Sequence, residues 1–317
     1  MTESTPYIRK DVKALLDLLA QAGAPPIDEQ TLEEARAGYL ALHTMADRPA
    51  RELAVIKDLS CPGPGGDIPL RLYDTREERE PGPVIVFYHG GGFVIGDLDT
   101  HQNLCTEIAH HMDLPVVAVD YRLAPEHPFP AAIEDCEAAT RWIAGSPAEL
   151  GRSATGIVTI GDSAGGNASI VIAQQLAKAP APVPVVLQVP IFPLAADATD
   201  TPSLAENADG YLLTARTMDF FTANNAADYN DSRAIPMLGD LTKTPPTVLA
   251  TASLDPIRDS GRIYAAALAN LGIDLVFLEM KGATHSFTNL RQAVPSYQAD
   301  TESIFAAMKL MLERHSA

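Results

Sequence analysis

The 317-residue chain has few cysteines, and their spacing suits neither a metal site nor a disulfide framework. Cys61, Cys105 and Cys136 lie far apart in the sequence, and no Cys-x-x-Cys pair is present. Structural zinc sites and disulfide-stabilised secreted folds both need closely spaced or paired cysteines. We therefore expect three buried free thiols and no bound metal.

Basic residues are also scarce, because 23 lysines and arginines stand against 41 acidic residues, a formal net charge of −18. Such a field repels phosphate backbones and anionic lipid headgroups, so nucleic-acid and membrane-surface partners are disfavoured. An acidic surface fits either ordinary solubility or adaptation to salt, and the sequence does not separate these two explanations.

Long apolar runs are missing as well. Met1–Leu19 carries six charged side chains and no uninterrupted apolar stretch, so it is no secretory signal and we expect a cytoplasmic protein. The longest uncharged stretch, Ala179–Ala196, contains five prolines. Proline removes backbone donors that a membrane helix needs, so this stretch is expected to be a strand with its loops.

What the chain does have is a regular alternation of β-rich and helical segments. Eight β-rich runs occur at Leu53–Leu59, Ile68–Tyr73, Val84–Tyr88, Val116–Asp120, Ile157–Ile160, Val185–Val189, Thr247–Ala252 and Leu275–Met280. From the third onward most are apolar on both faces, and helical patterns lie between them. This predicts a mostly parallel eight-stranded α/β sheet covered by helices on both sides.

Three segments depart from this alternation. Cys61–Asp67 is too short for a crossover helix, so the first two strands are predicted to form an antiparallel hairpin at one edge. Residues 1–45 and about 195–230 look helical and lack strands, so we expect them to form a separate lobe. Residues 46–194 and 231–317 then form the α/β core.

A Gly-Asp-Ser-Ala-Gly turn at residues 161–165 directly follows a predicted strand and precedes a helical run. A nucleophile on such a turn needs small neighbours, because the backbone is cramped and the hydroxyl has to be exposed. An ordinary glycine turn is the simpler alternative for so short a motif. The strand-and-helix context favours Ser163 as the nucleophile.

His89 and three glycines, residues 89–92, follow the strand that ends at Tyr88. Consecutive glycines allow backbone N–H groups to face a developing oxyanion without obstruction by side chains. A phosphate-cradling loop is the alternative, but the Gly-Lys-Ser/Thr of a P-loop is absent. The two glycine motifs together indicate acyl transfer.

A serine nucleophile requires a histidine base and an orienting acid, which in this type of chain follow in the order serine, acid, histidine. Asp255 comes at the carboxyl end of a predicted strand and is preferred over Asp259, whose position at a helix start already explains an acidic residue. His285 lies in a small-residue loop after the last strand. Histidines on the expected helices or lobe, such as His43, have a surface explanation.

These residues resemble the hormone-sensitive lipase-like esterases, the bacterial family IV branch of the α/β-hydrolases. The resemblance runs from about Ile68 to Phe287. Its motifs are residues 89–97, residues 120–130, the serine turn and Asp255-Pro256-Ile257-Arg258-Asp259.

The resemblance implies an α/β-hydrolase fold in which residues 1–45 and 195–230 form a helical cap. It also implies that Gly91, Gly92 and Ala164 donate their N–H groups to the oxyanion. Residues 120–130 are interpreted as a fixed loop that braces the glycine-rich turn, since prolines and alanines punctuate them.

The expected reaction is hydrolysis of small-molecule esters with short to medium acyl chains, through an acyl-enzyme and without a cofactor. Two other functions stay open: a binding protein on the same fold, and amide or peptide hydrolysis. The oligomeric state also stays open, with a homodimer as one alternative. The aromatic residues of the lobe are more typical of packing than of substrate contact, so the sequence assigns none of them to the substrate.

Overall fold

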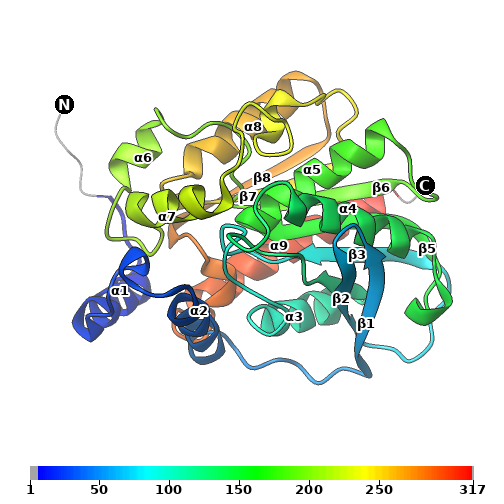
Figure 1. Ribbon diagram of the computed structural model, residues 1–317, viewed down its shortest axis with the longest axis horizontal. Helices are drawn as coiled ribbons and strands as arrows, with labels where there is room; N and C mark the ends of the chain where they lie inside the picture. Colours follow the sequence, from blue (N-terminus) through cyan, green and yellow to red (C-terminus); the bar gives the residue numbers. More distant parts are fainter. Residues whose placement is uncertain (1–5, 316–317) are drawn as a thin grey trace.

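A computed structural model describes residues 6–315 and contains one eight-stranded sheet in the order β1-β2-β4-β3-β5-β6-β7-β8 (Figure 1). The strands are β1 Val55–Gly63, β2 Gly66–Asp74, β3 Gly82–Tyr88, β4 Val116–Val119, β5 Ala154–Asp162, β6 Val185–Ile191, β7 Thr247–Leu254 and β8 Leu275–Thr284. All eight predicted strands are present, which confirms the predicted fold class. The hairpin is longer than expected, because Cys61 and Pro62 belong to β1 and only a tight turn at residues 63–66 remains.

The sheet is parallel from β3 to β8, while β2 runs antiparallel to both β1 and β4. After β3 the chain adds β4 on one side and β5 on the other. The carboxyl ends of β3 and β5 therefore flank the point where the order reverses, which is where open α/β sheets bind ligands.

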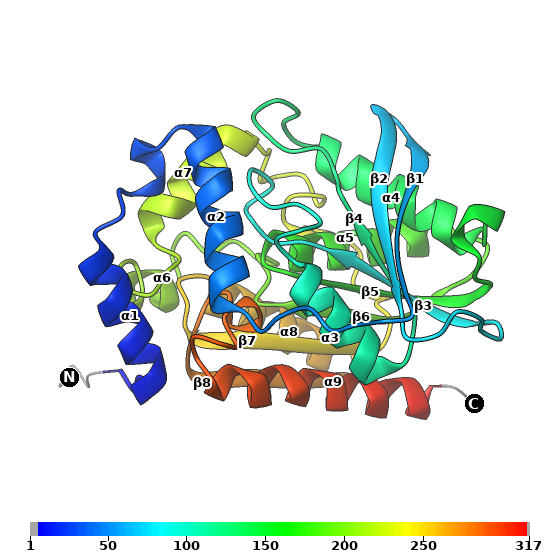
Figure 2. The same ribbon diagram turned by 90° about the horizontal axis from the view of Figure 1, so that it is seen from below.

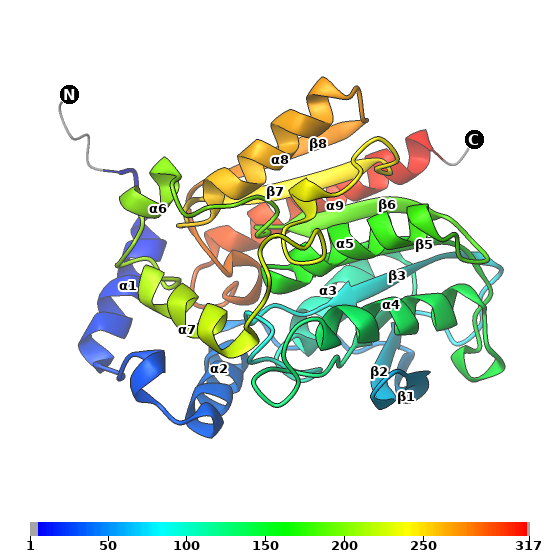
Figure 3. The ribbon, with the colours of Figure 1, turned by 45° about the horizontal axis from the view of Figure 1, so that its top comes forward.

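Helices cover both faces of the sheet (Figures 1 and 3). The helices are α1 Lys10–Ala22, α2 Leu32–Ala46, α3 Gln102–Met112, α4 Ala131–Ala144, α5 Ala164–Lys178, α6 Pro202–Glu206, α7 Ala215–Asn225, α8 Arg258–Asn270 and α9 Ser296–Arg314. Ile85 and Phe87 pack on the face of α3 and α9, and the alternate residues Val84 and Val86 pack on the face of α4 and α5. Both faces of β3 are apolar because both are buried.

The two strandless regions lie together beyond the carboxyl ends of the parallel strands, where α1, α2, α6 and α7 gather at one end of the molecule (Figures 2 and 3). Arg216 of α7 forms ion pairs of 2.6 Å with Asp28 and 2.7 Å with Glu29, both in the 3₁₀ turn Ile27–Glu29. Residues 1–5 of the predicted lobe lie outside the described residues. Among residues 6–315, no helix is both long and apolar enough to cross a membrane.

Candidate active site

Ser163 occupies the turn between β5 and α5, with φ 53° and ψ −115°, a combination that L residues rarely adopt. Its N–H donates a 2.9 Å hydrogen bond to the Ile191 carbonyl of β6, which helps to hold this turn. A Cβ at Gly165 would overlap the carbonyl oxygen of Tyr88. The glycine is thus required by the close approach of β3, and the turn presents the Ser163 hydroxyl at the sheet edge.

The structure places Ser163, His285 and Asp255 in one hydrogen-bonded row. Nε2 of His285 lies 2.8 Å from Oγ of Ser163, and Nδ1 lies 2.7 Å from Oδ2 of Asp255. The other Asp255 oxygen accepts a 2.9 Å hydrogen bond from the N–H of Ile257. Asp255 is fully buried, so its carboxylate is oriented by fixed donors and not by solvent. Such a row allows an imidazole to accept the serine proton.

Asp259, the rival acid, forms no hydrogen bond or ion pair with His285 in the described part of the chain. Its carboxylate accepts a 2.9 Å hydrogen bond from the N–H of Ser203 in α6 and pairs with Arg258 and Arg262. The expected helix-start position is found, since Asp259 lies in the first turn of α8. Its contacts show a further structural role, which is to tie α6 to the core.

The glycine-rich turn after β3 is tightly packed and leaves backbone N–H groups unpaired among the described residues. Gly91 has φ 119°, and a Cβ there would overlap the Ile95 carbonyl. The N–H groups of Gly91, Gly92 and Ala164 donate no hydrogen bond within residues 6–315. They are therefore free to bind an external oxyanion.

Residues 120–130 contact the glycine-rich turn directly. The Tyr121 hydroxyl donates a 2.6 Å hydrogen bond to the carbonyl of His89 and its ring stacks on the imidazole. The Ala124 N–H donates to the Phe93 carbonyl at 2.9 Å. Arg122 is held by the buried carboxylate of Asp135. These contacts agree with the bracing role expected for this loop.

A cavity of about 1270 Å³ lies over Ser163 and His285. Its roof comes from residues 19–45 and 208–221, and its floor includes Gly91 and Gly92. The ring of Phe221 in α7 occupies the space where a Gly92 side chain would be. Phe221 is one of the aromatic residues of the lobe that the sequence assigned to packing. Its helical spacing does not predict a contact with the glycine-rich turn.

His43 also differs from the expectation of a surface position, because it is buried and lines the cavity. Its ring is tilted by 50° against that of Tyr39, one turn earlier on α2, with 4.1 Å between the ring centroids, and its Nδ1 lies 3.2 Å from the Thr100 carbonyl. Burial lowers the pKa of His43 to about 3, so the ring is neutral. His43 thus lies on the inner face of α2, which the sequence did not predict.

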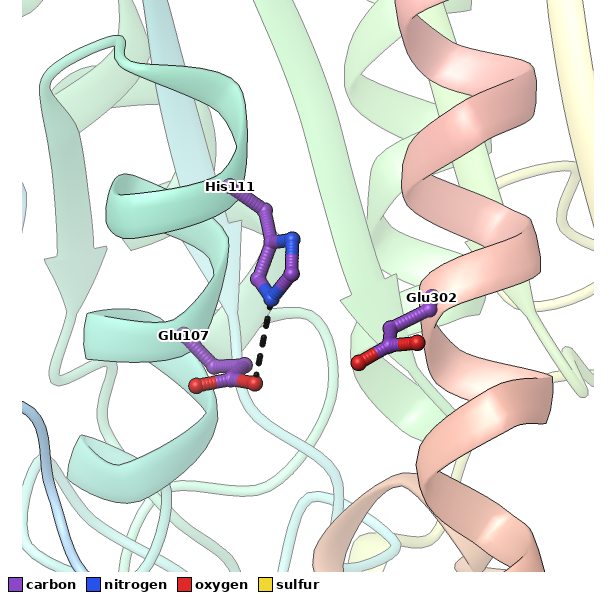
Figure 4. A group of neighbouring side chains, drawn as sticks. All are labelled: Glu107, His111 and Glu302. Carbon is purple, nitrogen blue, oxygen red and sulfur yellow. Dashed lines mark hydrogen bonds and ion pairs between the residues drawn. The ribbon is translucent and has the colours of Figure 1, made fainter.

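One further group, Glu107, His111 and Glu302, combines metal-ligating residue types between α3 and α9 (Figure 4). Glu107 already accepts hydrogen bonds from His111 at 3.2 Å and Gln298 at 2.8 Å, and it pairs with Arg51. Burial alone would raise the pKa of Glu107, but Arg51, Gln298 and Arg291 lower it to about 2. We interpret the group as a structural ion-pair cluster that ties α3 to α9.

The sequence pattern that defines the alpha/beta hydrolase fold matches residues 85–289, which include every candidate site residue. The chain belongs to the α/β-hydrolase family. Within that family, esterase LipI of Mycobacterium tuberculosis is 38% identical over 268 residues, covering 82% of this chain and 83% of the relative. The ethyl acetate hydrolase of Pseudomonas putida is 33% identical, covering 89% and 92%.

A solved α/β hydrolase of the same shape is the ester-hydrolase EH1AB1 from the metagenome of Lake Arreo. It superposes with a TM-score of 0.90 at 32% identity, covering 95% of this chain and 98% of that one. These relatives confirm the predicted resemblance to hormone-sensitive lipase-like esterases, and the structural match extends over 95% of this chain.

Proposed function

We propose that the protein hydrolyses small carboxylic esters, with Ser163 as nucleophile, His285 as general base and Asp255 as the orienting acid. The observation that carries this proposal is the hydrogen-bonded row of these three side chains beside three free backbone donors. The esterase names of the relatives support the same class of reaction.

In the proposed cycle Ser163 attacks the ester carbonyl while His285 Nε2 accepts the hydroxyl proton and then delivers it to the leaving alcohol. The N–H groups of Gly91, Gly92 and Ala164 stabilise the oxyanion of each tetrahedral intermediate. Water, activated by the same imidazole, then attacks the acyl-enzyme and releases the acid. The imidazole returns the proton that it takes from water to Oγ of Ser163 as the acyl bond breaks, which restores the free enzyme.

We also propose that residues 1–45 and 195–230 act as a cap that selects short to medium acyl chains. The roofed cavity is large enough for an acyl chain together with an alcohol group of some size. Each methylene that enters an apolar pocket contributes up to about 0.8 kcal/mol, or about fourfold in kcat/KM. Beyond the depth of the cavity this gain ends, so the rate should rise with chain length, peak and fall.

The charges at the rim of the cavity favour neutral or cationic esters. Asp28, Glu29, Glu34 and Asp209 line it. Among residues 6–315, the only lysine or arginine in the lining is Arg216, which is already paired with Asp28 and Glu29. With the overall charge of −18, this rim repels an approaching anion. We accordingly propose small neutral or cationic esters as substrates, and exclude nucleic-acid and anionic membrane partners on the same ground. A cytoplasmic location is part of the proposal.

The proposal is tested with p-nitrophenyl esters from acetate to palmitate, assayed with wild type and Ser163→Ala. The substitution should lower kcat by about 10⁴-fold or more while leaving the fold intact. Matching p-nitroanilides distinguish an amidase, which would cleave both series at comparable rates. Ester binding without turnover in wild type would instead identify a binding protein.

A further inference from the structure

Asp162, the residue before Ser163, is a buried carboxylate that contacts three other chain segments. Its side chain is 1% exposed. Oδ1 accepts a 2.9 Å hydrogen bond from the N–H of Gly90, and Oδ2 lies 3.2 Å from both His101 Nε2 and Asn289 Nδ2. These partners come from the glycine-rich turn, the start of α3 and the loop that follows His285.

Asp162 itself and two of its partners, Gly90 and Asn289, lie close in sequence to groups of the proposed catalytic machinery. Asp162 adjoins Ser163, Gly90 adjoins the first oxyanion donor, and Asn289 lies four residues after the histidine base. A Cβ at Gly90 would lie 2.5 Å from Asp162 Oδ2, so the glycine also permits the contact. One carboxylate thus connects the three loops that have to be in register for acyl transfer.

A buried negative charge is costly unless donors surround it. Burial alone would raise the pKa of the Asp162 carboxyl, but the charge and hydrogen bond of His101 lower it below its ordinary value. A negative charge does not by itself stabilise an oxyanion. Its contribution to the reaction therefore lies in orienting donors, above all the peptide that precedes the Gly91 N–H.

We propose that Asp162 is a positioning residue that holds the oxyanion-binding turn and the His285 loop in register with Ser163, with His101 and Asn289 as its partners. The inference rests on the proposed function, because it assigns a role within the same site. It predicts a loss of transition-state stabilisation and little loss of substrate binding.

Asp162→Asn tests this role, because an amide offers one acceptor and cannot satisfy Gly90, His101 and Asn289 together. The assay measures kcat for p-nitrophenyl butyrate per active site, with sites counted by fluorophosphonate titration. We expect kcat per titrated site to fall about 10–100-fold while KM changes less than about threefold. The inhibition constant of a trifluoromethyl ketone, which forms a tetrahedral adduct, should rise in parallel with the loss of kcat/KM.

Asp74→Asn is the matched control, because Asp74 is equally buried and is ion-paired with Arg79 and Arg152. It ends β2, beside the start of β4 and away from the carboxyl ends of the parallel strands. The control should lower the melting temperature and leave kcat per titrated site unchanged. A purely structural role for Asp162 would give this same pattern and would overturn the inference.

Asn289→Ala removes the hydrogen bond from Asn289 to Asp162. It tests the positioning role if the Asp162 variant does not fold. It should lower kcat per titrated site severalfold at constant KM, and an unchanged kcat would refute the inference. Ser163→Ala distinguishes a failure of the proposed function from a failure of the positioning role. Ester hydrolysis retained in that variant would refute the proposed function itself, whereas an inactive Ser163 variant beside an unaffected Asp162 variant would refute only the positioning role.

Discussion

Exchanging Asp255 for asparagine should disable His285 by fixing the wrong tautomer of its ring. The two Asp255 oxygens have separate tasks, because one accepts from the Ile257 N–H and the other faces Nδ1 of His285. Asparagine supplies one oxygen and one NH₂ group. With the oxygen toward Ile257, the NH₂ group donates to Nδ1, the proton moves to Nε2, and the ring can no longer accept the Ser163 proton.

The opposite amide orientation leaves two donors facing each other, the NH₂ group and the Ile257 N–H. An unsatisfied buried donor costs about 1–3 kcal/mol, so the inactive tautomer dominates. The variant also loses the carboxylate that stabilises the imidazolium formed during attack. We expect kcat to fall about 10³–10⁴-fold, which corresponds to about 4–5.5 kcal/mol in activation free energy.

Asp259→Asn is the matched comparison, since both aspartates lie in the same loop and helix start and both changes are isosteric. It weakens contacts with Ser203, Arg258 and Arg262, so it should lower the melting temperature and leave kcat nearly unchanged. Steady-state hydrolysis of p-nitrophenyl butyrate and circular dichroism measure the two effects. A larger loss of kcat in the Asp259 variant, with its fold intact, would refute the choice of acid.

Three further perturbations follow from the structure. Gly165→Ala should abolish soluble folded enzyme, because the new Cβ would overlap the Tyr88 carbonyl. Gly82→Ala is the control and should be tolerated, because its Cβ would lie 3.9 Å from the nearest atom, the Glu80 carbonyl oxygen. Equal yields of soluble enzyme from the two variants would contradict the cramped turn. Burial lowers the folded pKa of His43 to about 3 and of His89 to about 4, while unfolded histidine titrates near about 6.5. The free energy of unfolding therefore falls as the pH drops below about 6.5, by about 2 kcal/mol for each histidine at pH 5. Equal free energies of unfolding in urea at pH 7 and pH 5 would disprove this. Deleting residues 1–45 should lower stability and broaden the acyl-chain profile, and a truncated enzyme with the wild-type profile would exclude them from the cap.

The sequence was informative where structure depends on local chemistry. The β-rich runs identified all eight strands found in residues 6–315, and the signal was clearest for strands such as β3 and β4, which are apolar because both of their faces are buried. It likewise indicated Ser163, Asp255 and His285, which the structure brings within hydrogen-bonding distance. The signal was the position of each residue after a strand end, and parallel strands place those ends at one edge.

The sequence was less informative where a role depends on residues far apart in the chain. Asp162 was only a variable position within the serine motif, because its partners lie 72, 61 and 127 residues away. The burial of His43 was missed for the same reason, since the inner face of α2 is defined by the core beneath it. The hairpin was predicted too short because pairing with a neighbour overrides the low strand propensity of glycine and proline.

The separation of roof and floor in the cavity has a practical consequence for redesign. Ser163, Asp255 and His285 come from loops of the sheet, whereas the proposed cap enters at the start of the chain and between β6 and β7. A foreign cap could therefore be grafted at these two chain connections without moving Ser163, Asp255 or His285. Because Phe221 rests on Gly92, α7 is the place where a transplanted roof has to match the catalytic floor.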